Sequence, residues 1–206
     1  MLAGQRAFAN MRTMLAHAAL SLFVVVRLYD IHGVPNETLT TARDAAARIM
    51  RDADINLRWA DCPCSQAVGS AELMIRVASA GQGAEPKSLG FSYVDVNQKA
   101  GTLATVFAER VYALAAIAHA DEGELLGRAM AHEIAHLLFG THDHAHAGLM
   151  RGTWTSIELG RNQPTDWMLS RDEAVRLRAA LLRRIRGVQT PVVVAAGEAI
   201  EPLNAP

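Results

Sequence analysis

The sequence is poor in cysteine, carries almost no net charge and lacks a long hydrophobic run, and each shortage excludes a class of protein. Only two of 206 residues are cysteine, so no framework of disulfides replaces a hydrophobic core. The formal net charge is −1, so no charge excess indicates a nucleic acid or an anionic membrane as partner. Half of the residues are hydrophobic, which is enough to fold one domain.

The two cysteines stand in the run Cys62-Pro63-Cys64. A bridge between cysteines at this spacing closes a strained loop, so we expect two free thiols in a turn. A bond to a partner chain and the binding of a metal are the alternatives. Because the pair is not a disulfide framework, it does not indicate a cellular compartment.

The N-terminal residues are predicted to be an appended segment. Arg6 and Arg12 precede an apolar stretch, and Ala16-His17-Ala18 resembles a cleavage site, but the apolar run is too short for an ordinary signal peptide. Leu22–Val26 is too short to span a membrane. The chain therefore divides into an appended segment, a domain and a flexible tail, at residues 1–20, 21–187 and 188–206. Cytoplasmic and exported locations both stay open.

Hydrophobic periodicity predicts an α+β domain with a mixed, twisted sheet of about five strands. The strands are expected at Ser21–Tyr29, Ile55–Ala60, Glu72–Ala78, Leu89–Val94 and Thr102–Phe107. Helices are expected at Thr38–Ala53, Ala108–His119, Asp121–Phe139 and Arg171–Arg186, with a polar loop from Met150 to Pro164. The first strand, helix and strand predict a parallel pair joined by a right-handed crossover.

The run His132-Glu133-Ile134-Ala135-His136 is an H-E-x-x-H motif inside the third expected helix. Positions i and i+4 share one face of a helix, so both imidazoles can bind one zinc ion beside the carboxylate. Asp121 is placed to cap this helix, and Gly140 is placed to end it. The motif is typical of zinc-dependent hydrolases, in which the glutamate is the general base.

A catalytic zinc usually takes three protein ligands and keeps one position for water. In gluzincins the third ligand is a later glutamate, for which Glu158 and Glu173 are candidates here. In metzincins it is a histidine after a glycine, followed by a methionine turn, and the order of residues here fits this pattern better. Counting from His132, from Gly140 or with a longer loop selects His142, Asp143 or His144, and counting alone does not choose among them.

The segment from His132 to Trp154 resembles a family of small bacterial metallopeptidases of metzincin-like type. Their recurring pattern is H-E-I/L-G-H-L-L-L-G-x-x-x-H-x-x-x-G-I/L-M-R-x-x-W. This chain matches it at His132, Glu133, His136, Gly140, His144, Gly148, Met150, Arg151 and Trp154. Together with similar upstream strands, the resemblance covers most of residues 22–186. It departs at Ala135, where the family usually has glycine, and in the extra histidines His142 and His146.

The resemblance implies a single metzincin-like zincin domain, in which the sheet packs on the crossover helix and the active-site helix and a C-terminal helix follows. It also implies a Zn²⁺ site with a short loop and favours His144 as third ligand, with His142 as the alternative. Met150 would form the turn under the metal or pack in the core, while Arg151 and Trp154 are expected to pack that turn.

The sequence thus predicts a zinc-dependent metallopeptidase that cleaves peptide or protein substrates, with Glu133 as general base. An antiparallel edge strand, Thr102–Phe107 or Leu89–Val94, would hold an extended substrate. The alternative is a zinc-binding protein without catalysis, which buffers or senses the metal or uses it for stability. Such a site would be closed by a fourth ligand, for example His142 or His146.

Overall fold

The computed structural model describes residues 22–69, 71–81 and 87–189. Its strands are β1 (Leu22–Asp30), β2 (Ile55–Cys62), β3 (Leu73–Ala78), β4 (Gly90–Asp95) and β5 (Ala100–Phe107). Its α-helices are α1 (Asn36–Asp52), α2 (Ala108–Ala118), α3 (Glu122–Phe139), α4 (Ser156–Arg161) and α5 (Arg171–Gln189), and a 3₁₀ helix η1 covers Pro164–Trp167.

The five strands form one mixed sheet in the order β2-β1-β3-β5-β4. Strands β1 and β2 pair in parallel around the crossover helix α1, as predicted, and β1 with β3 and β3 with β5 are also parallel. Only β4 runs antiparallel, against β5. Of the two strands expected to bind substrate, β5 is therefore internal, and β4 is the one with an open edge.

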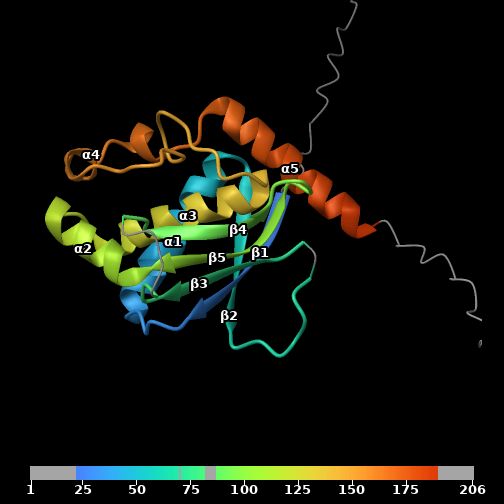
Figure 1. Ribbon diagram of the computed structural model, residues 1–206, viewed down its shortest axis with the longest axis horizontal. Helices are drawn as coiled ribbons and strands as arrows, with labels where there is room; N and C mark the ends of the chain where they lie inside the picture. The colour runs from blue at the N-terminus through green and yellow to red at the C-terminus, as the bar shows by residue number, and fades with distance from the viewer. Residues whose placement is uncertain (1–21, 70, 82–86, 190–206) are drawn as a thin grey trace, which may run out of the picture.

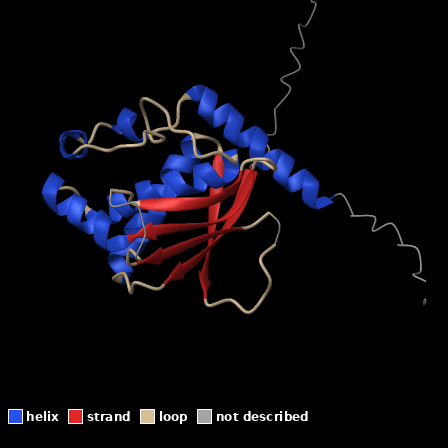
Figure 2. Ribbon diagram, viewed as in Figure 1, coloured by secondary structure: helices blue, strands red, loops and turns tan. Residues whose placement is uncertain are grey.

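The helices α1, α3 and α5 lie on the same side of the sheet (Figure 1). Alternation along the strands turns one row of apolar side chains toward these helices. In β3, for example, Leu73, Ile75 and Val77 are fully buried and alternate with partly exposed residues. Figure 2 shows the resulting layers, with α3 and α5 above most of the sheet. The predicted mixed sheet with a crossover helix, a motif helix and a C-terminal helix is confirmed.

Helix α3 is the central element of the core, and fifteen of its residues are buried. It begins where Asp121 accepts a hydrogen bond from the Glu124 amide at 2.8 Å, which satisfies one of the free N–H groups of the first turn. It ends at Gly140, whose positive φ of 68° is a conformation that glycine adopts without strain. Both helix ends lie where the sequence predicted them.

Three expectations are changed by the structure. The polar loop before Pro164 contains the short helix α4, which Thr155 and Glu158 cap reciprocally. Cys62 and Cys64 are bonded to each other, so the expectation of free thiols is wrong; the turn at the end of β2 brings their Cα atoms to 4.6 Å, within disulfide range. Helix α5 continues to Gln189, beyond the expected end at Arg186.

The expected N-terminal segment, residues 1–20, and residues 190–206 of the expected tail lie outside the described residues. Within the part that the structure describes, no helix combines the length and the apolar character that a membrane span requires.

Candidate metal centre

Three histidines of the cluster predicted from the sequence converge at the C-terminal end of α3. The Nε2 atoms of His132 and His136 lie 3.0 Å apart, and those of His136 and His144 lie 3.3 Å apart. His132 and His136 come from consecutive turns of the helix and are buried, whereas His144 comes from the following loop and is exposed. Among the described residues, these three form the only group of histidine, cysteine or carboxylate side chains close enough to share a metal ion.

Main-chain carbonyls orient the two helical imidazoles. The Nδ1–H of His132 donates to the Leu149 carbonyl at 2.9 Å, and that of His136 donates to the Thr141 carbonyl at 2.8 Å. A carbonyl oxygen can only accept, so in each neutral ring the hydrogen sits on Nδ1 and the Nε2 atom carries a lone pair. The contact of 3.0 Å between the two Nε2 atoms is then not a hydrogen bond, because neither atom has a hydrogen to donate.

Partial or complete removal from water lowers the pKa of all three imidazoles. It is the main cause that lowers the pKa of His132 to about 3, and the neighbouring His136 adds to the effect. Burial also lowers the pKa of His136 to about 4, against the opposing bond to the Thr141 carbonyl, and it lowers the pKa of His144. All three rings are therefore neutral near pH 7, which is the form that binds a metal.

The donor set fits a zinc ion. Zinc accepts imidazole nitrogen at about 2.0–2.1 Å in tetrahedral geometry, which places neighbouring nitrogens about 3.3 Å apart. The two Nε2–Nε2 separations, 3.0 and 3.3 Å, match this spacing, and the ligand atoms all lie within 4.8 Å of one another. Facing lone pairs that have no hydrogen between them are stabilised by a cation placed among them.

Glu133 is held against the edge strand β4. The hydroxyl of Ser92, which is buried, lies 2.6 Å from Oε2 of Glu133 and 3.0 Å from the Glu133 main-chain oxygen. Burial raises the pKa of Glu133 to about 7, while the Ser92 hydrogen bond acts in the opposite direction. The carboxyl group is thus positioned to exchange a proton near neutral pH.

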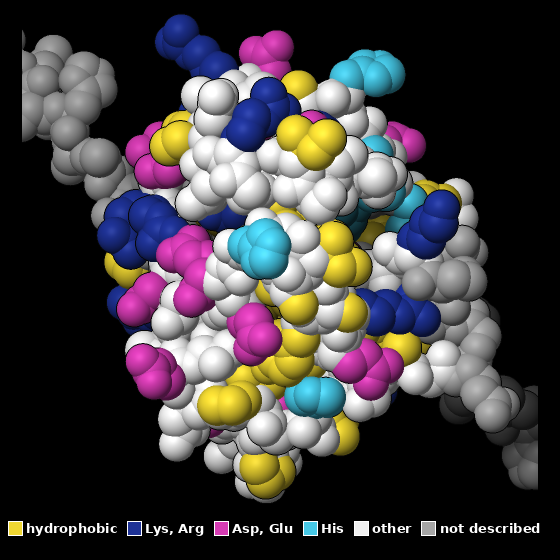
Figure 3. All heavy atoms as spheres, turned by 90° about the vertical axis from the view of Figure 1, so that its left-hand side faces the viewer, with side chains coloured by type: hydrophobic (Ala, Val, Ile, Leu, Met, Phe, Trp, Pro, Cys, Tyr) yellow, Lys and Arg dark blue, Asp and Glu magenta, His cyan; other side chains and the backbone are white. Residues whose placement is uncertain are grey.

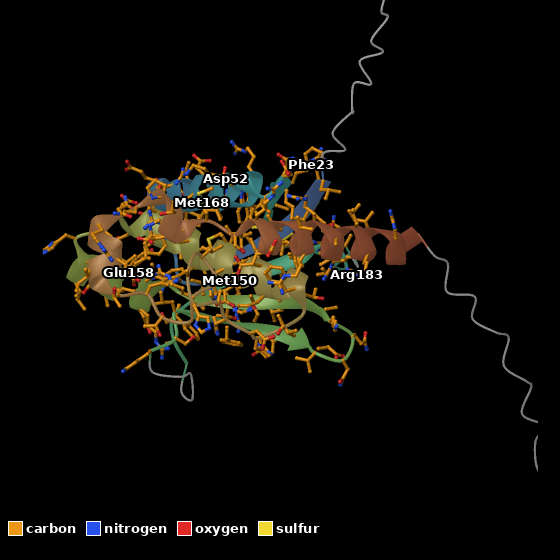
Figure 4. The ribbon with its side chains drawn as sticks, turned by 90° about the horizontal axis from the view of Figure 1, so that it is seen from above. Phe23, Asp52, Met150, Glu158, Met168 and Arg183 are labelled. Carbon is orange, nitrogen blue, oxygen red and sulfur yellow. A yellow bond between two sulfur atoms is a disulfide. The ribbon has the colours of Figure 1, made fainter. Side chains whose placement is uncertain are left out.

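The loop after His144 folds back beneath the helix. Its Leu149 is fully buried and supplies the carbonyl that holds His132, and Met150 is buried beside it. The Ala145 amide donates to the Met150 carbonyl at 2.8 Å, which closes the loop into a tight turn. In Figure 4, Met150 lies near the middle of the molecule, while Glu158 lies at the α4 end.

An aromatic stack supports this turn from outside. The Trp154 ring meets the His132 ring edge to face, with centroids 5.7 Å apart, and Trp154 in turn meets Trp167 at 5.5 Å. The guanidinium of Arg128 lies 4.2 Å from the centre of the Trp167 ring, and that of Arg151 lies 5.5 Å from it. Arg151 and Trp154 therefore pack the turn, as the sequence predicted.

The other candidate ligands lie outside the histidine cluster. His142 is exposed and lines a groove beside β4 and β5, together with Ser92 and Tyr93. The Asp143 amide bonds the Thr141 hydroxyl, and neither Asp143 nor His146 belongs to the group. Glu158 pairs with Arg151 and caps α4, and Glu173 caps α5 with Ser170. In Figure 3, histidine side chains reach the surface on the end of the molecule that carries α2 and α4.

Two contributors to the site were not predicted from the sequence. Ser92 contacts Glu133 only because β4 docks on α3, and no local pattern in the sequence marks that contact. Trp167 reaches the stack through η1 and α4, for which the Thr155-x-x-Glu158 capping pattern was the available signal.

No protein-family model matches the chain, and no curated protein matches it in sequence. Among solved structures, the chain is similar to archaemetzincin from Methanopyrus kandleri, with a TM-score of 0.51 and 14% identity over 82% of this chain and 100% of that one. It is also similar to metalloproteinase-II from Bacteroides fragilis, with a TM-score of 0.49 and 15% identity over 80% of this chain and 55% of that one. The first similarity confirms the predicted metzincin-like fold.

Proposed function

We propose that the chain is a zinc-dependent metallopeptidase that hydrolyses peptide bonds. The observation that carries the proposal is the convergence of three neutral imidazoles next to a buried glutamate on the same helix. Among the described residues, three histidine side chains are close enough to bind one metal ion. Three protein ligands with one open position are typical of catalytic rather than structural zinc sites. The ligands that we propose are His132, His136 and His144.

Each residue has a distinct task in this proposal. Bound zinc would polarise the scissile carbonyl and acidify the attacking water. Glu133 accepts a proton from that water and delivers it to the leaving nitrogen, for which a pKa of about 7 suits both transfers. The carbonyls of Leu149 and Thr141 hold the His132 and His136 rings with Nε2 directed at one point.

The edge strand β4 is the proposed binding strand for substrate. Among the strands that the structure describes, it pairs with β5 alone, so one row of its amide and carbonyl groups faces away from the sheet, toward an extended peptide. Exposed Tyr93 and the groove that His142 lines lie along the same strand. An extended peptide or an unfolded segment of a protein is therefore the class of substrate that the site would accept.

The proposal is tested with purified protein, fluorescein-labelled casein and a measurement of zinc content. The wild type should bind one zinc per chain and cleave casein, and a chelator should stop the cleavage. Glu133→Gln should keep its zinc and lose at least about a hundredfold in rate. Glu122→Gln replaces an exposed carboxylate on the same helix, so this matched control should cleave normally.

Two results would contradict the proposal. Full activity of Glu133→Gln would remove the general base from the mechanism. Stoichiometric zinc without any chelator-sensitive cleavage would favour the alternative function, a zinc-binding protein without catalysis.

A further inference from the structure

Ser92 is a buried serine on the open edge strand β4, and its side chain faces α3. Its hydroxyl is within hydrogen-bond distance of Oε2 of Glu133 at 2.6 Å and of the Glu133 main-chain oxygen at 3.0 Å. A short bond to one carboxylate oxygen restricts the rotation of the glutamate side chain and distinguishes its two oxygens. Oε1 is then the oxygen that this bond does not occupy.

Gly90 makes room for the same carboxyl group. It lies two residues before Ser92, so both positions belong to the same face of the strand. A Cβ atom on Gly90 would lie 3.0 Å from Oε1 of Glu133, 3.2 Å from its Cγ and 2.6 Å from the Thr105 carbonyl. The glutamate therefore rests between a hydroxyl on one side and bare backbone on the other, and a larger residue at position 90 would displace it.

From this arrangement we infer that Ser92 is a positioning residue, which holds Glu133 in the orientation needed for proton transfer. The inference rests on the proposed function and adds to it a residue outside the zinc motif. The hydrogen-bond partner of the Ser92 hydroxyl is Glu133, so Ser92 would act through that residue. Gly90 is part of the same device, because it provides the space in which the held carboxylate lies.

The register of β4 connects this device to substrate binding. The Phe107 amide donates to the Leu89 carbonyl at 2.8 Å, and along an antiparallel pair the bonded residues alternate. The N–H and C=O groups of Gly90 and Ser92 consequently point away from β5, toward the open edge. The Gly90 carbonyl accepts a hydrogen bond from the Ser88 hydroxyl, so a peptide that adds to this edge would bond through its backbone chiefly to Ser92. Substrate alignment and the orientation of the general base would thus share one short stretch of strand.

The test uses Ser92→Ala in the zinc-loaded chain of 206 residues, with Thr105→Val as matched control. Thr105 is a buried hydroxyl residue on the neighbouring strand, and its hydroxyl accepts a hydrogen bond from Arg76 rather than contacting Glu133. Ser92→Ala should lower kcat for casein about tenfold at unchanged KM and zinc content. Thr105→Val should leave kcat unchanged.

A second measurement does not depend on activity. In protein labelled with ¹³C at the glutamate carboxyl carbons, the Glu133 signal is assigned by its loss in Glu133→Gln. Ser92→Ala should move this signal while the other glutamate signals stay in place, and Thr105→Val should move none. An unmoved Glu133 signal would overturn the inference, even if kcat fell. If the wild type failed to cleave casein, the proposed function would be refuted, and the carboxyl signal would still decide whether Ser92 holds Glu133.

Discussion

Replacing Gly127 with alanine tests whether α3, which carries the H-E-x-x-H motif, is held in place by close contact with α1. A Cβ atom at position 127 would lie 2.3 Å from the Ala42 carbonyl oxygen and 2.6 Å from the Ala45 Cβ. Carbon atoms in good contact are about 3.5–4.0 Å apart, so the two helices would have to separate. The atoms in the way belong to the backbone and to a short side chain, which cannot rotate aside.

Two opposing effects set the size of the change. Alanine is favoured over glycine in a helix interior by about 1 kcal/mol, and overpacking a tight contact costs about 1–3 kcal/mol. Because the overlap is with backbone, we place the overpacking cost in the upper part of its range, at about 2–3 kcal/mol, and expect a net loss of about 1–2 kcal/mol. For a chain of this size, that corresponds to a decrease in Tm of about 2–8 °C.

The assay is thermal unfolding followed by circular dichroism at saturating zinc, with Gly187→Ala as matched control. Gly187 lies in α5, and no atom is within 4 Å of its would-be Cβ, so only helix propensity should act there. That substitution should raise Tm by at most about 4 °C. An increase in Tm for Gly127→Ala similar to that for Gly187→Ala would refute the close packing of α1 on α3.

Two further predictions concern the third ligand and the response to acid. His144→Ala should weaken zinc binding, measured by competition with a chromophoric chelator, whereas His142→Ala should bind as the wild type does; the reverse order would contradict the proposed ligand set. The hydrogen bonds from Thr155, its backbone amide first, hold the pKa of Glu158 below its ordinary value. Its contribution to stability is therefore present above the pKa of the unfolded chain and lost as the pH falls through the lower, folded-state pKa. Glu158→Gln should unfold with a smaller loss of Tm between pH 7 and about pH 3 than the wild type, and an identical acid profile would contradict this role.

Much of the fold was predictable because its signals are local. Asp121 and Gly140 mark the ends of the motif helix by residue type alone, and both are found there in the structure. The reciprocal cap of Ser170 and Glu173 on α5 was equally visible in the sequence. The short helix α4 was missed because six residues, of which only Ile157 and Leu159 are apolar, are too few to show a helical periodicity, and only the Thr155 cap could have revealed it.

The site was only partly predictable, for reasons of geometry. The spacing in the motif predicts that His132 and His136 share a helix face, and the structure shows this. The path of the following loop decides which of His142, Asp143 and His144 reaches that face, and counting residues does not determine a loop path. The contact between Ser92 and Glu133 joins residues 41 positions apart, so it depends on the docking of β4 against α3.

The main-chain anchors of His132 and His136 affect how freely this protein can change during evolution. The acceptors are the carbonyl oxygens of Leu149 and Thr141, which every amino acid would supply at those positions. Substituting either side chain leaves the acceptor in place as long as the backbone follows the same path. The path of the loop backbone, rather than the identity of any neighbouring side chain, therefore sets the orientation of the two imidazole rings. Neighbouring residues could therefore be substituted one at a time while the His132 and His136 rings keep their orientation.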